Sequence, residues 1–420
     1  MQAEKNTAMA RRNILHLDQD TFFVSVERLR NSQLNGKPVI IGGMGDRGVV
    51  ASCSYEARLY GVHSAMPMKL ARHLCADAVF IRGDMQAYSR YSDLVTLIIA
   101  DKAPLYEKAS IDEHYLDITG MDRFFGCVQW AAELRQTIIR ETGLPMSMGL
   151  SQNKTVAKIA TGEAKPNGEL LVGPDRVIPF LDPLSVKKIP MVGPRTYDTL
   201  RTMGITTIGT LRRIPPGVIA RMMGKNGQEI WKRANGIDHS PVQAWNEQKS
   251  MGTEATFETD TTDLDHIRTT LSSMCEKLAF NLRNSQQLTG CVVVKIRYAN
   301  YDTHTMQQKL PFTSFDHILD PLCKSLFNRL YTRRMRIRLV GIQFSRLVRG
   351  VQQLSMFEES TKPANLYQAI DNMRRKHGTH IITKANITTT AVACDGPTAA
   401  RSAANCTERS DVPTAKPLRG

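Results

Sequence analysis

The chain has 420 residues, and its 55 Lys and Arg against 40 Asp and Glu give a formal net charge of +15. At roughly 100 to 200 residues per domain, this length indicates two to four domains with a sizeable core. It excludes a small scaffold that depends on disulfides or bound metals for its stability. The charge favours a polyanionic partner such as nucleic acid, although a merely soluble basic protein would have the same composition.

The N-terminal part of the chain alternates short predicted strands with predicted helices. Its polar start is followed by no apolar run long enough for a signal peptide or a membrane span, so we expect a soluble, cytoplasmic protein without a membrane partner. Residues 13–17 alternate apolar and polar side chains and lead into Asp18, Gln19 and Asp20, which predicts a strand with carboxylates at its C-terminal end. Further strands are predicted over residues 37–43, 48–52 and 145–150, and helical segments over 21–29 and 55–60. This alternation indicates an α/β or α+β domain.

A second acidic cluster lies between residues 104 and 120. Asp112 and Glu113 are flanked there by apolar residues such as Ile111 and Leu116, which predicts another strand. Two separate strands of the same domain therefore carry acids.

Beyond residue 168 the sequence pattern changes from alternating strands and helices to helices alone. Residues 186–209 have a helix-turn-helix pattern, typical of a small helical domain. Residues 239–250 lack periodicity and are interpreted as a linker, with an ordered extended segment as the alternative. An α+β module follows, with predicted helices over 264–284 and 321–331 and predicted strands over 290–299 and 336–348. Residues 388–420 have few large apolar side chains, so we expect them to be disordered.

Eight cysteines are scattered along the chain, with no CxxC pair and no histidine nearby at ligand spacing. This pattern argues against a zinc site. We interpret these side chains as reduced thiols of a cytosolic protein.

The acids on the two predicted strands, Asp18 on one and Asp112 with Glu113 on the other, are candidates for a metal site. Nucleotidyl transfer needs charge neutralisation on the attacking and leaving oxygens, and two magnesium ions about 4 Å apart, held by carboxylate oxygens, supply it. Strand alternation would place Asp112 and Glu113 on opposite faces, so both can serve only at a turn or a bulge. On spacing alone, these acids could equally cap helices or lie on solvated edges.

Five sequence motifs in a fixed order make the metal interpretation more specific. They are HLDQDTFFVSVE, CSYEARLYGV, ASIDEHYLDI, GLSQNKTVAKIATGEAKPNG and PMVGPRTYDTLRTMGI. Together they closely resemble the motifs of the Y-family of lesion-bypass DNA polymerases, best of all the DNA polymerase IV type, over about residues 11–357. The resemblance implies an α+β, multidomain fold arranged as a right hand. Its parts would be a palm at residues 11–19 and 84–172, fingers at 20–83, a helical thumb at 173–240, a linker at 241–250 and a little finger at 251–350.

The same resemblance implies a catalytic metal site. Asp18, Asp112 and Glu113 match the carboxylates that bind two Mg²⁺ ions, and Gln19 would contribute its backbone carbonyl. Asp20 could share a face with Asp18, but the family pattern assigns it no ligand role.

Four residues match the positions of the family that bind the incoming nucleotide. Tyr55 and Arg58 match positions that hold the triphosphate, a task that suits a phenol donor and a guanidinium three residues apart on one helical face. Lys165 matches the phosphate-binding lysine. Phe23 matches the steric gate, whose ring leaves no room for a ribose 2′-hydroxyl, and Phe22 would be its neighbour in the core.

Residues 189–205 resemble a helix-hairpin-helix, whose backbone amides hold a DNA phosphate without reading the bases. Met191 stands where the family has the first glycine of the turn, and only Gly193 is retained. How closely this turn approaches a phosphate is therefore open, and a hairpin that serves packing alone is the alternative.

A second candidate for DNA binding is the stretch 331–349, which has six arginines and no acid. The arginines are Arg333, Arg334, Arg336, Arg338, Arg346 and Arg349. Such a run is often only a solvated face, but its place in the implied little finger favours a track for DNA phosphates. Arg336 and Arg338 would share one face of the predicted strand. Six phosphate contacts would make log K fall with log salt at a slope of roughly −5.

Just past the last predicted domain, Gln353, Leu354, Met356 and Phe357 form a sequence, QLSMF, that resembles the peptide by which bacterial polymerases bind the sliding clamp. A few apolar side chains on an extended tether commonly fill a hydrophobic pocket in this way. Met356 in place of leucine is a mild departure from the pattern. The helix-like stretch at 365–377 has no assigned role.

Taken together, the resemblance implies a monomeric DNA-directed DNA polymerase for translesion synthesis that transfers nucleotides from dNTPs to a primer 3′-OH with low fidelity. No segment suggests a proofreading exonuclease. One alternative is a non-catalytic DNA- and clamp-binding relative of the same fold, against which Asp18, Asp112 and Glu113 speak. The other is a palm-domain phosphotransferase such as a nucleotide cyclase, which would need neither the hairpin nor the clamp peptide.

Overall fold

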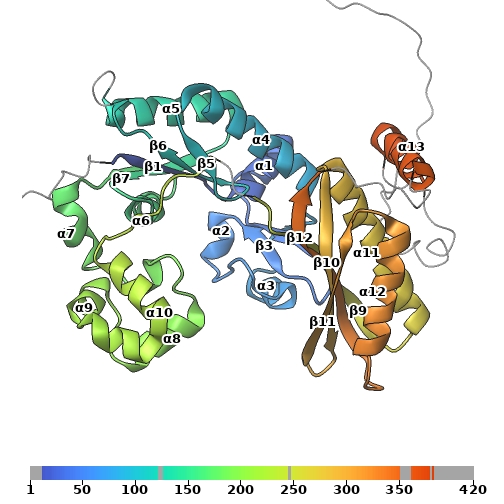
Figure 1. Ribbon diagram of the computed structural model, residues 1–420. Coiled ribbons are helices and arrows are strands. Elements are labelled where there is room, and N and C mark those ends of the chain that lie inside the picture. Colours follow the sequence, from blue (N-terminus) through green and yellow to red (C-terminus); the bar gives the residue numbers. More distant parts are fainter. Residues whose placement is uncertain (1–11, 122–125, 245–246, 351–360, 379–380, 383–420) are drawn as a thin grey trace, which may run out of the picture. The chain divides into compact units, whose positions relative to one another are not determined.

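The computed structural model describes residues 12–121, 126–244, 247–350, 361–378 and 381–382. Two compact units make up the chain, Met1–Glu247 and Gln248–Gly420, and Figure 1 shows their helices and strands. The predicted clamp-binding peptide at 353–357 and the predicted disordered tail at 388–420 lie outside the described residues. No helix among the described residues is long and apolar enough to cross a membrane.

The first unit contains a five-stranded sheet with the order β5-β6-β1-β7-β8. Its strands are β5 (Tyr106–Lys108), β6 (Glu113–Asp117), β1 (Ile14–Gln19), β7 (Met146–Ser151) and β8 (Glu169–Leu171). Leu15 and Leu17 of β1 pack into a core with α4 (Met85–Lys102) and α5 (Cys127–Thr142). The opposite face is covered by α6 (Lys154–Ala164). The two acid-bearing strands predicted from the sequence are neighbours in this sheet.

A three-stranded sheet, ordered β3-β2-β4, lies in the same unit. The elements around it are α1 (Phe22–Arg30), β2 (Val39–Gly42), β3 (Val50–Cys53), α2 (Tyr55–Arg58), α3 (Met68–Leu74) and β4 (Val79–Ile81). Val39 and Ile41 pack against Val24 of α1, whereas Ile40 packs against Ala57 of α2. Successive residues of β2 therefore face α1 and α2 in turn, which positions the two helices beside the sheet.

Residues 174–234 form a helical region. Its elements are α7 (Val177–Leu181), the 3₁₀ turn η4 (Val186–Lys188), α8 (Pro194–Thr202), α9 (Ile208–Arg213) and α10 (Pro216–Ala234). The predicted helix-turn-helix at 186–209 is thus a short 3₁₀ turn followed by α8. The chain then returns to the five-stranded sheet, because Val242 is buried against Ile14 and Ala157. The beginning of the predicted linker at 241–250 is therefore packed on the first unit.

The second unit has a four-stranded antiparallel sheet, ordered β11-β10-β12-β9, with two helices on one face. Its elements are β9 (Ser250–Thr261), α11 (Leu264–Asn284), β10 (Gln287–Tyr298), β11 (Thr303–Thr313), α12 (Asp316–Leu330) and β12 (Ile337–Arg349). Helix α11 has the predicted bounds, because Asp263 caps its first amides. Helix α12 begins five residues before the predicted start, so that Pro321 lies inside it.

A further helix, α13 (Thr361–His377), packs on the helices of the second unit. Arg283 of α11 bonds to Asp371 of α13 at 2.6 Å and to Asp316 of α12 at 2.7 Å. Tyr367 of α13 stacks on Phe315, with ring centroids 5.4 Å apart. The six cysteines within the described residues are buried.

Candidate active site

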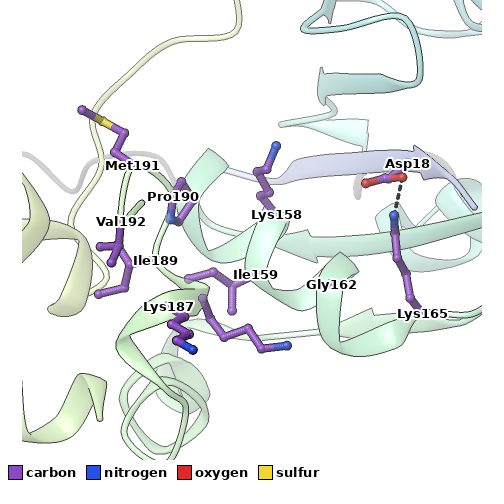
Figure 2. Close-up of a pocket in the computed structure, with 11 residues that line it drawn as sticks. Asp18, Lys158, Ile159, Gly162, Lys165, Lys187, Ile189, Pro190, Met191 and Val192 are labelled. Carbon is purple, nitrogen blue, oxygen red and sulfur yellow. Dashed lines mark hydrogen bonds and ion pairs between the residues drawn. The ribbon is translucent and has the colours of Figure 1, made fainter. Parts of the chain in front are cut away.

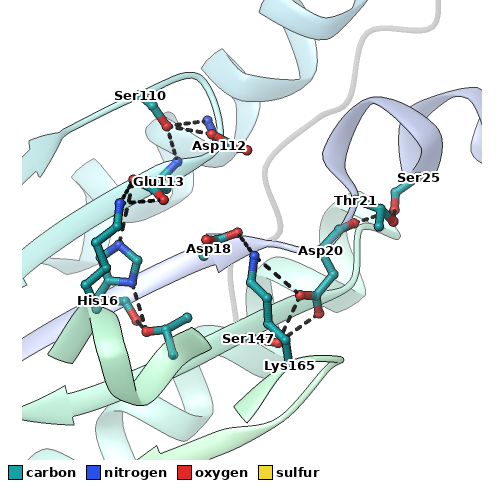
Figure 3. A network of polar contacts seen from close by, with 12 residues as sticks. His16, Asp18, Asp20, Thr21, Ser25, Ser110, Asp112, Glu113, Ser147 and Lys165 are labelled. Atoms are coloured by element: carbon teal, nitrogen blue, oxygen red, sulfur yellow. Dashed lines mark hydrogen bonds and ion pairs between the residues drawn. The ribbon is translucent and has the colours of Figure 1, made fainter. Parts of the chain in front are cut away.

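The two acid-bearing strands bring carboxylates opposite each other. In the antiparallel pairing of β1, Asp18 lies opposite Glu113 of β6 and opposite Ser147 of β7. Residues paired in this way point to the same face of a sheet. That face is covered by α6, whose Thr161 hydroxyl lies 2.8 Å from Nδ1 of His16. Asp18 and Glu113 are therefore neighbours beneath α6 (Figure 3).

Asp112 reaches the same end of the sheet because it precedes the strand. It lies in the bend before β6, where its carbonyl accepts a hydrogen bond from the backbone N of Gln19 at 3.1 Å. The Ser110 hydroxyl stabilises this bend by donating to Asp112 Oδ1 at 2.5 Å and accepting from the backbone N of Glu113 at 3.0 Å. Because Asp112 lies in the bend and Glu113 in the strand, strand alternation does not force the two side chains onto opposite faces of the sheet.

Two lysines neutralise these carboxylates. Lys165 Nζ lies 2.5 Å from Asp18 Oδ1, and Lys158 Nζ lies 2.8 and 2.6 Å from the two oxygens of Glu113. Burial raises the pKa of Asp18 to about 6; Lys165 opposes this shift, whereas Glu113 and Asp112 add to it. The site is thus a group of neighbouring acids whose ionised forms require positive charge nearby for stabilisation.

The donor set fits a divalent metal. As they stand, no three Asp, Glu, His or Cys side chains in the described part of the chain are close enough to hold an ion, since ammonium groups engage Asp18 and Glu113. The carboxylates of Asp18, Asp112 and Glu113 are the hard oxygen ligands that Mg²⁺ prefers. Gln19 is 1 % exposed, and its side-chain amide atoms have no hydrogen-bond partner among the described residues; the use of its backbone carbonyl as a ligand stays a prediction.

The predicted triphosphate-binding residues lie on two elements of the first unit. The Ser54 hydroxyl caps α2, which carries Tyr55 and Arg58, and the Arg58 guanidinium lies 4.9 Å from the centroid of the Tyr55 ring. Burial, followed by the charge of Asp20, raises the pKa of Tyr55 to about 12. The phenol therefore keeps its proton near neutral pH and is a donor. Lys165, the third predicted residue, bonds to Asp18.

Phe22 and Phe23 begin α1 and have different surroundings. Phe22 is 3 % exposed and belongs to the core of the five-stranded sheet. Phe23 is half-buried, and its ring stacks on Tyr88 with centroids 4.4 Å apart. Phe22 is thus a core residue, and Phe23 packs at the edge of the same core; its gate role stays a prediction.

A cavity of about 380 Å³ connects Asp18 with the turn that precedes α8 (Figure 2). Its charged lining residues are four lysines, Lys158, Lys165, Lys187 and Lys188, and one acid, Asp18, so the charge along its wall is predominantly positive. In the turn, Gly193 precedes α8 as its N-cap. Met191 has a φ of 78°, the left-handed backbone conformation that favours glycine, and its side chain is 60 % exposed.

The predicted arginine track of the second unit divides into paired and free side chains. Arg333 lies 3.0 Å from Asp302, and Arg338 lies 3.9 Å from Asp260 and stacks over the ring of Tyr301. The run has no acid of its own, but strand β9 and the turn between β10 and β11 supply these partners. Arg334 and Arg336 are exposed, and neither has an ion-pair partner among the described residues. Arg336 precedes β12, so of Arg336 and Arg338 only Arg338 lies in the strand.

The sequence did not predict the contacts of three residues of the first unit: Lys158, Asp20 and Arg135. Lys158 lies one helical turn after Lys154 on α6, a spacing that places both on one face. Asp20 and Arg135 are buried at 1 % and 3 % exposure and bond to residues distant in sequence. Only the spacing of Lys158 was visible in the sequence.

Known proteins resemble this chain over most of its length. Residues 17–162 match the model of the impB/mucB/samB family, and residues 248–356 match the C-terminal domain of the same family. A DNA polymerase IV of Dehalococcoides mccartyi is 37 % identical over 374 residues, which cover 88 % of this chain and 96 % of that protein. One of Methanoculleus marisnigri is 38 % identical over 354 residues, or 83 % of this chain and 98 % of the relative.

Solved structures agree in fold. A Y-family DNA polymerase chimera, Dbh-Dpo4(243-245)-Dbh, aligns with a TM-score of 0.74 at 24 % identity, over 80 % of this chain and all of the chimera. The chain belongs to the Y-family of DNA polymerases. Its full-length relatives are of the polymerase IV type, and it is a DNA-directed DNA polymerase.

Proposed function

We propose that the protein extends primers past template lesions by two-metal nucleotidyl transfer from dNTPs, with low fidelity and without a proofreading exonuclease. The observation that carries the proposal is the apposition of Asp18 with Glu113 across two strands, with Asp112 in the adjoining bend. Polymerase IV relatives that are similar over most of the chain support the translesion role.

Two Mg²⁺ ions would be held by Asp18, Asp112, Glu113 and the carbonyl of Gln19. When bound, they would neutralise charge on the attacking and leaving oxygens. The side chains that now neutralise the acids, Lys158 and Lys165, would then be released. Lys165 would be free to bind the phosphates of the nucleotide.

The nucleotide would lie between Phe23 and the donors Tyr55, Arg58 and Lys165. A protonated phenol, a guanidinium and an ammonium all donate to phosphate oxygens and accept nothing from them. The ring of Phe23, held by its stacking on Tyr88, would exclude a ribose 2′-hydroxyl. The chemistry would consist of positioning and electrostatics, because no nucleophilic side chain takes part.

In this proposal the five-stranded sheet belongs to the palm, at residues 11–19 and 84–172. The other parts are the fingers (20–83), the thumb (173–240), a linker (241–250) and the little finger (251–350). The lysine-lined cavity and the turn at Gly193 support a phosphate contact by the thumb. A related chain was solved as an "Insertion ternary complex of Dbh DNA polymerase", which supports binding of primer-template DNA and a dNTP.

Arg334 and Arg336 are the little-finger arginines best placed to meet DNA, since Arg333 and Arg338 already have acidic partners. If only two phosphates are neutralised there, this domain adds roughly −2 to the slope of log K against log salt. Six contacts would have added about −5.

Recruitment and location complete the proposal. Gln353, Leu354, Met356 and Phe357 would bind a bacterial sliding clamp. The protein would work as a monomer in the cytoplasm, where the chromosome of a bacterium is found.

Primer extension on a labelled primer-template tests the proposal. Wild type should extend the primer past a lesion in Mg²⁺ and leave a mismatched 3′ end uncut. Asp112→Ala and Glu113→Ala should each lower extension at least about 100-fold, because a bound cation supplies several kcal/mol, and should bind DNA as wild type does. Asp93→Ala, at an exposed acid paired with Lys108, is the control and should have no effect.

A wild-type protein that binds DNA but does not extend it would establish the non-catalytic alternative. Cyclisation of a nucleotide without a template would establish the phosphotransferase alternative. Near-normal extension by both variants would remove these acids from the mechanism.

A further inference from the structure

Asp20 lies at the point where the predicted nucleotide-binding side chains meet. Its carboxylate is 1 % exposed, and Oδ2 accepts hydrogen bonds from the Ser147 hydroxyl at 2.8 Å and from the backbone N of Asn167 at 2.7 Å. The Tyr55 hydroxyl donates to Oδ1 at 3.4 Å, and Lys165 Nζ lies 3.9 Å from the same oxygen. One buried carboxylate thus contacts four residues of three separate segments: α2, β7 and the turn after α6 (Figure 3 shows it with Ser147 and Lys165).

These contacts make Asp20 a poor metal ligand. To turn toward an ion, the carboxylate would have to leave the two short hydrogen bonds from Ser147 and Asn167. A buried donor that loses its acceptor costs the full desolvation penalty. The bonds also extend to the next residue, because Ser147 Oγ accepts from the backbone N of Gly168 at 3.3 Å.

Arg135 of α5 holds the same turn from the other side. It is 3 % exposed, and its Nη2 donates to the carbonyl and to Oδ1 of Asn167, both at 2.7 Å. The remaining donors reach the carbonyl of Met146 and Oε1 of Glu169, each at 2.7 Å. The planar guanidinium therefore connects the turn to β7 and β8 in one fixed geometry.

Asn167 is consequently held at all its polar backbone atoms. Asp20 accepts from its N–H and Arg135 donates to its carbonyl. Its φ of 50° is left-handed, a conformation that surrounding bonds must stabilise in a residue other than glycine. Lys165 is two residues away, so the position of its backbone follows from this grip.

The bond from Tyr55 has a different character. At 3.4 Å it is long for an O–H···O bond and correspondingly weak. The phenol can therefore turn its hydrogen from Asp20 to a phosphate oxygen at little cost. The short hydrogen bonds of Asp20 fix the turn, and the long one leaves the Tyr55 hydroxyl able to donate to a phosphate.

We propose that Asp20 and Arg135 are positioning residues for the triphosphate: together they fix the turn that carries Lys165 and hold Tyr55 facing it. This inference rests on the proposed polymerase function and assigns a task to two buried charges outside the metal-binding set. Their loss weakens nucleotide binding and leaves metal binding unchanged.

The first experiment measures the dissociation constant of a dNTP on a complex with dideoxy-terminated primer-template, on which no chemistry can follow. The second uses an extendable primer and measures KM, kcat and the Mg²⁺ concentration for half-maximal extension. Asp20→Asn keeps the shape but loses the charge and one acceptor. Arg135→Lys keeps the charge but loses the fork. Each should weaken dNTP binding and raise KM about 10-fold, the worth of one charge-assisted hydrogen bond, with kcat and the Mg²⁺ requirement unchanged.

Arg140→Lys is the matched control, because Arg140 lies on the same helix with a side chain that is 75 % exposed. It should leave every constant unchanged. Thermal unfolding and the affinity for primer-template DNA show whether each variant is folded. If Asp20→Asn does not fold, Arg135→Lys and Ser147→Ala carry the same comparison.

Three outcomes would overturn the inference. A higher Mg²⁺ requirement with unchanged dNTP binding in Asp20→Asn would make Asp20 a metal ligand. Unchanged dNTP binding in both variants would leave the network without a role at this site. Equal losses of dNTP and DNA affinity would indicate general damage to the fold. A wild-type chain that binds dNTP on DNA but never extends a free primer would instead refute the proposed function.

Discussion

Phe23 shows how one residue sets the sugar selectivity that we propose. Its ring is half-buried and stacks on Tyr88 with an interplanar angle of 15°. A stacked ring has little freedom to move aside, so a 2′-hydroxyl that meets it must clash. Exclusion of this kind needs no hydrogen bond to the sugar.

Phe23→Ala should therefore admit ribonucleotides and change dNTP incorporation little. The measurement compares kcat/KM for matched rNTP and dNTP in wild type and variant, and the ratio should rise at least about 10-fold, the effect of removing a steric penalty of roughly 1.4 kcal/mol.

Phe22→Leu is the control for that substitution, because Phe22 is 3 % exposed in the adjacent core. It should lower the thermal stability and leave the sugar ratio as it was. An unchanged ratio in Phe23→Ala would return Phe23 to a packing role.

At the scale of single elements, the turn before α8 contains a strained residue. Met191 has a φ of 78° and a side chain 60 % exposed, so packing does not compensate the conformation. A residue with a Cβ loses about 1–2 kcal/mol in the left-handed region. The side chain also lies in the wall of the lysine-lined cavity, where DNA would approach.

Met191→Gly should raise the free energy of unfolding by up to about 1 kcal/mol, since the greater chain entropy of glycine offsets part of the gain. It should also tighten binding to primer-template, because the backbone could come closer to a phosphate. Denaturant unfolding and fluorescence anisotropy measure the two effects. Met191→Ala keeps the Cβ and should gain no stability; equal gains in both variants would refute the strain argument.

Helix α13 depends on a buried ion network. Side chains of Arg283, Asp316 and Asp371 are 11 %, 3 % and 3 % exposed, and Arg283 bridges the two acids. Removing one member of a buried pair typically costs 3–5 kcal/mol. A helix of 17 residues is marginal once detached from its protein.

Asp371→Ala should therefore release α13 while the rest of the second unit stays folded. Limited proteolysis should cut within residues 361–377 much faster than in wild type, and the fragment that ends before α13 should resist further digestion. Asn372→Ala, on the exposed side of the same helix, is the control and should be cut like wild type. Equal resistance of Asp371→Ala would mean that the ring contacts of Tyr367 and the ion pair between Arg374 and Glu276 suffice.

At the scale of the whole molecule, the sequence predicted those elements whose pattern is local. Helix α11 has the predicted bounds, and the acid-bearing strands were predicted because apolar residues precede Asp18 in one and flank Asp112 and Glu113 in the other. Strands β9 and β11 were missed: they form the two edges of their sheet, and β11 in particular is mostly polar and exposed. An edge strand is defined by its partner, which a local pattern does not contain.

The candidate site divides in the same way. The motifs predicted Asp18, Asp112 and Glu113, and the sheet places the first opposite the third. The task of Asp20 could not be predicted, because its partners Ser147 and Asn167 lie 127 and 147 residues further along the chain. Likewise, no local feature shows that Arg283 meets Asp371, 88 residues away.

The proposed recruitment by a sliding clamp concerns the whole molecule, because in the sequence the peptide at 353–357 follows the last strand of the second unit and precedes α13. It lies beyond the palm and the little finger that we propose. Leu354→Ala with Phe357→Ala should therefore spare synthesis on a short primer-template. On primed circular DNA loaded with a bacterial clamp, the stimulation seen with wild type should disappear, since a few anchors carry most of such an interface. Ser355→Ala, between the anchors, is the control and should be stimulated normally. If the peptide instead packs on the second unit, the double variant loses thermal stability and activity even without the clamp, and clamp stimulation that survives both substitutions would refute the docking role.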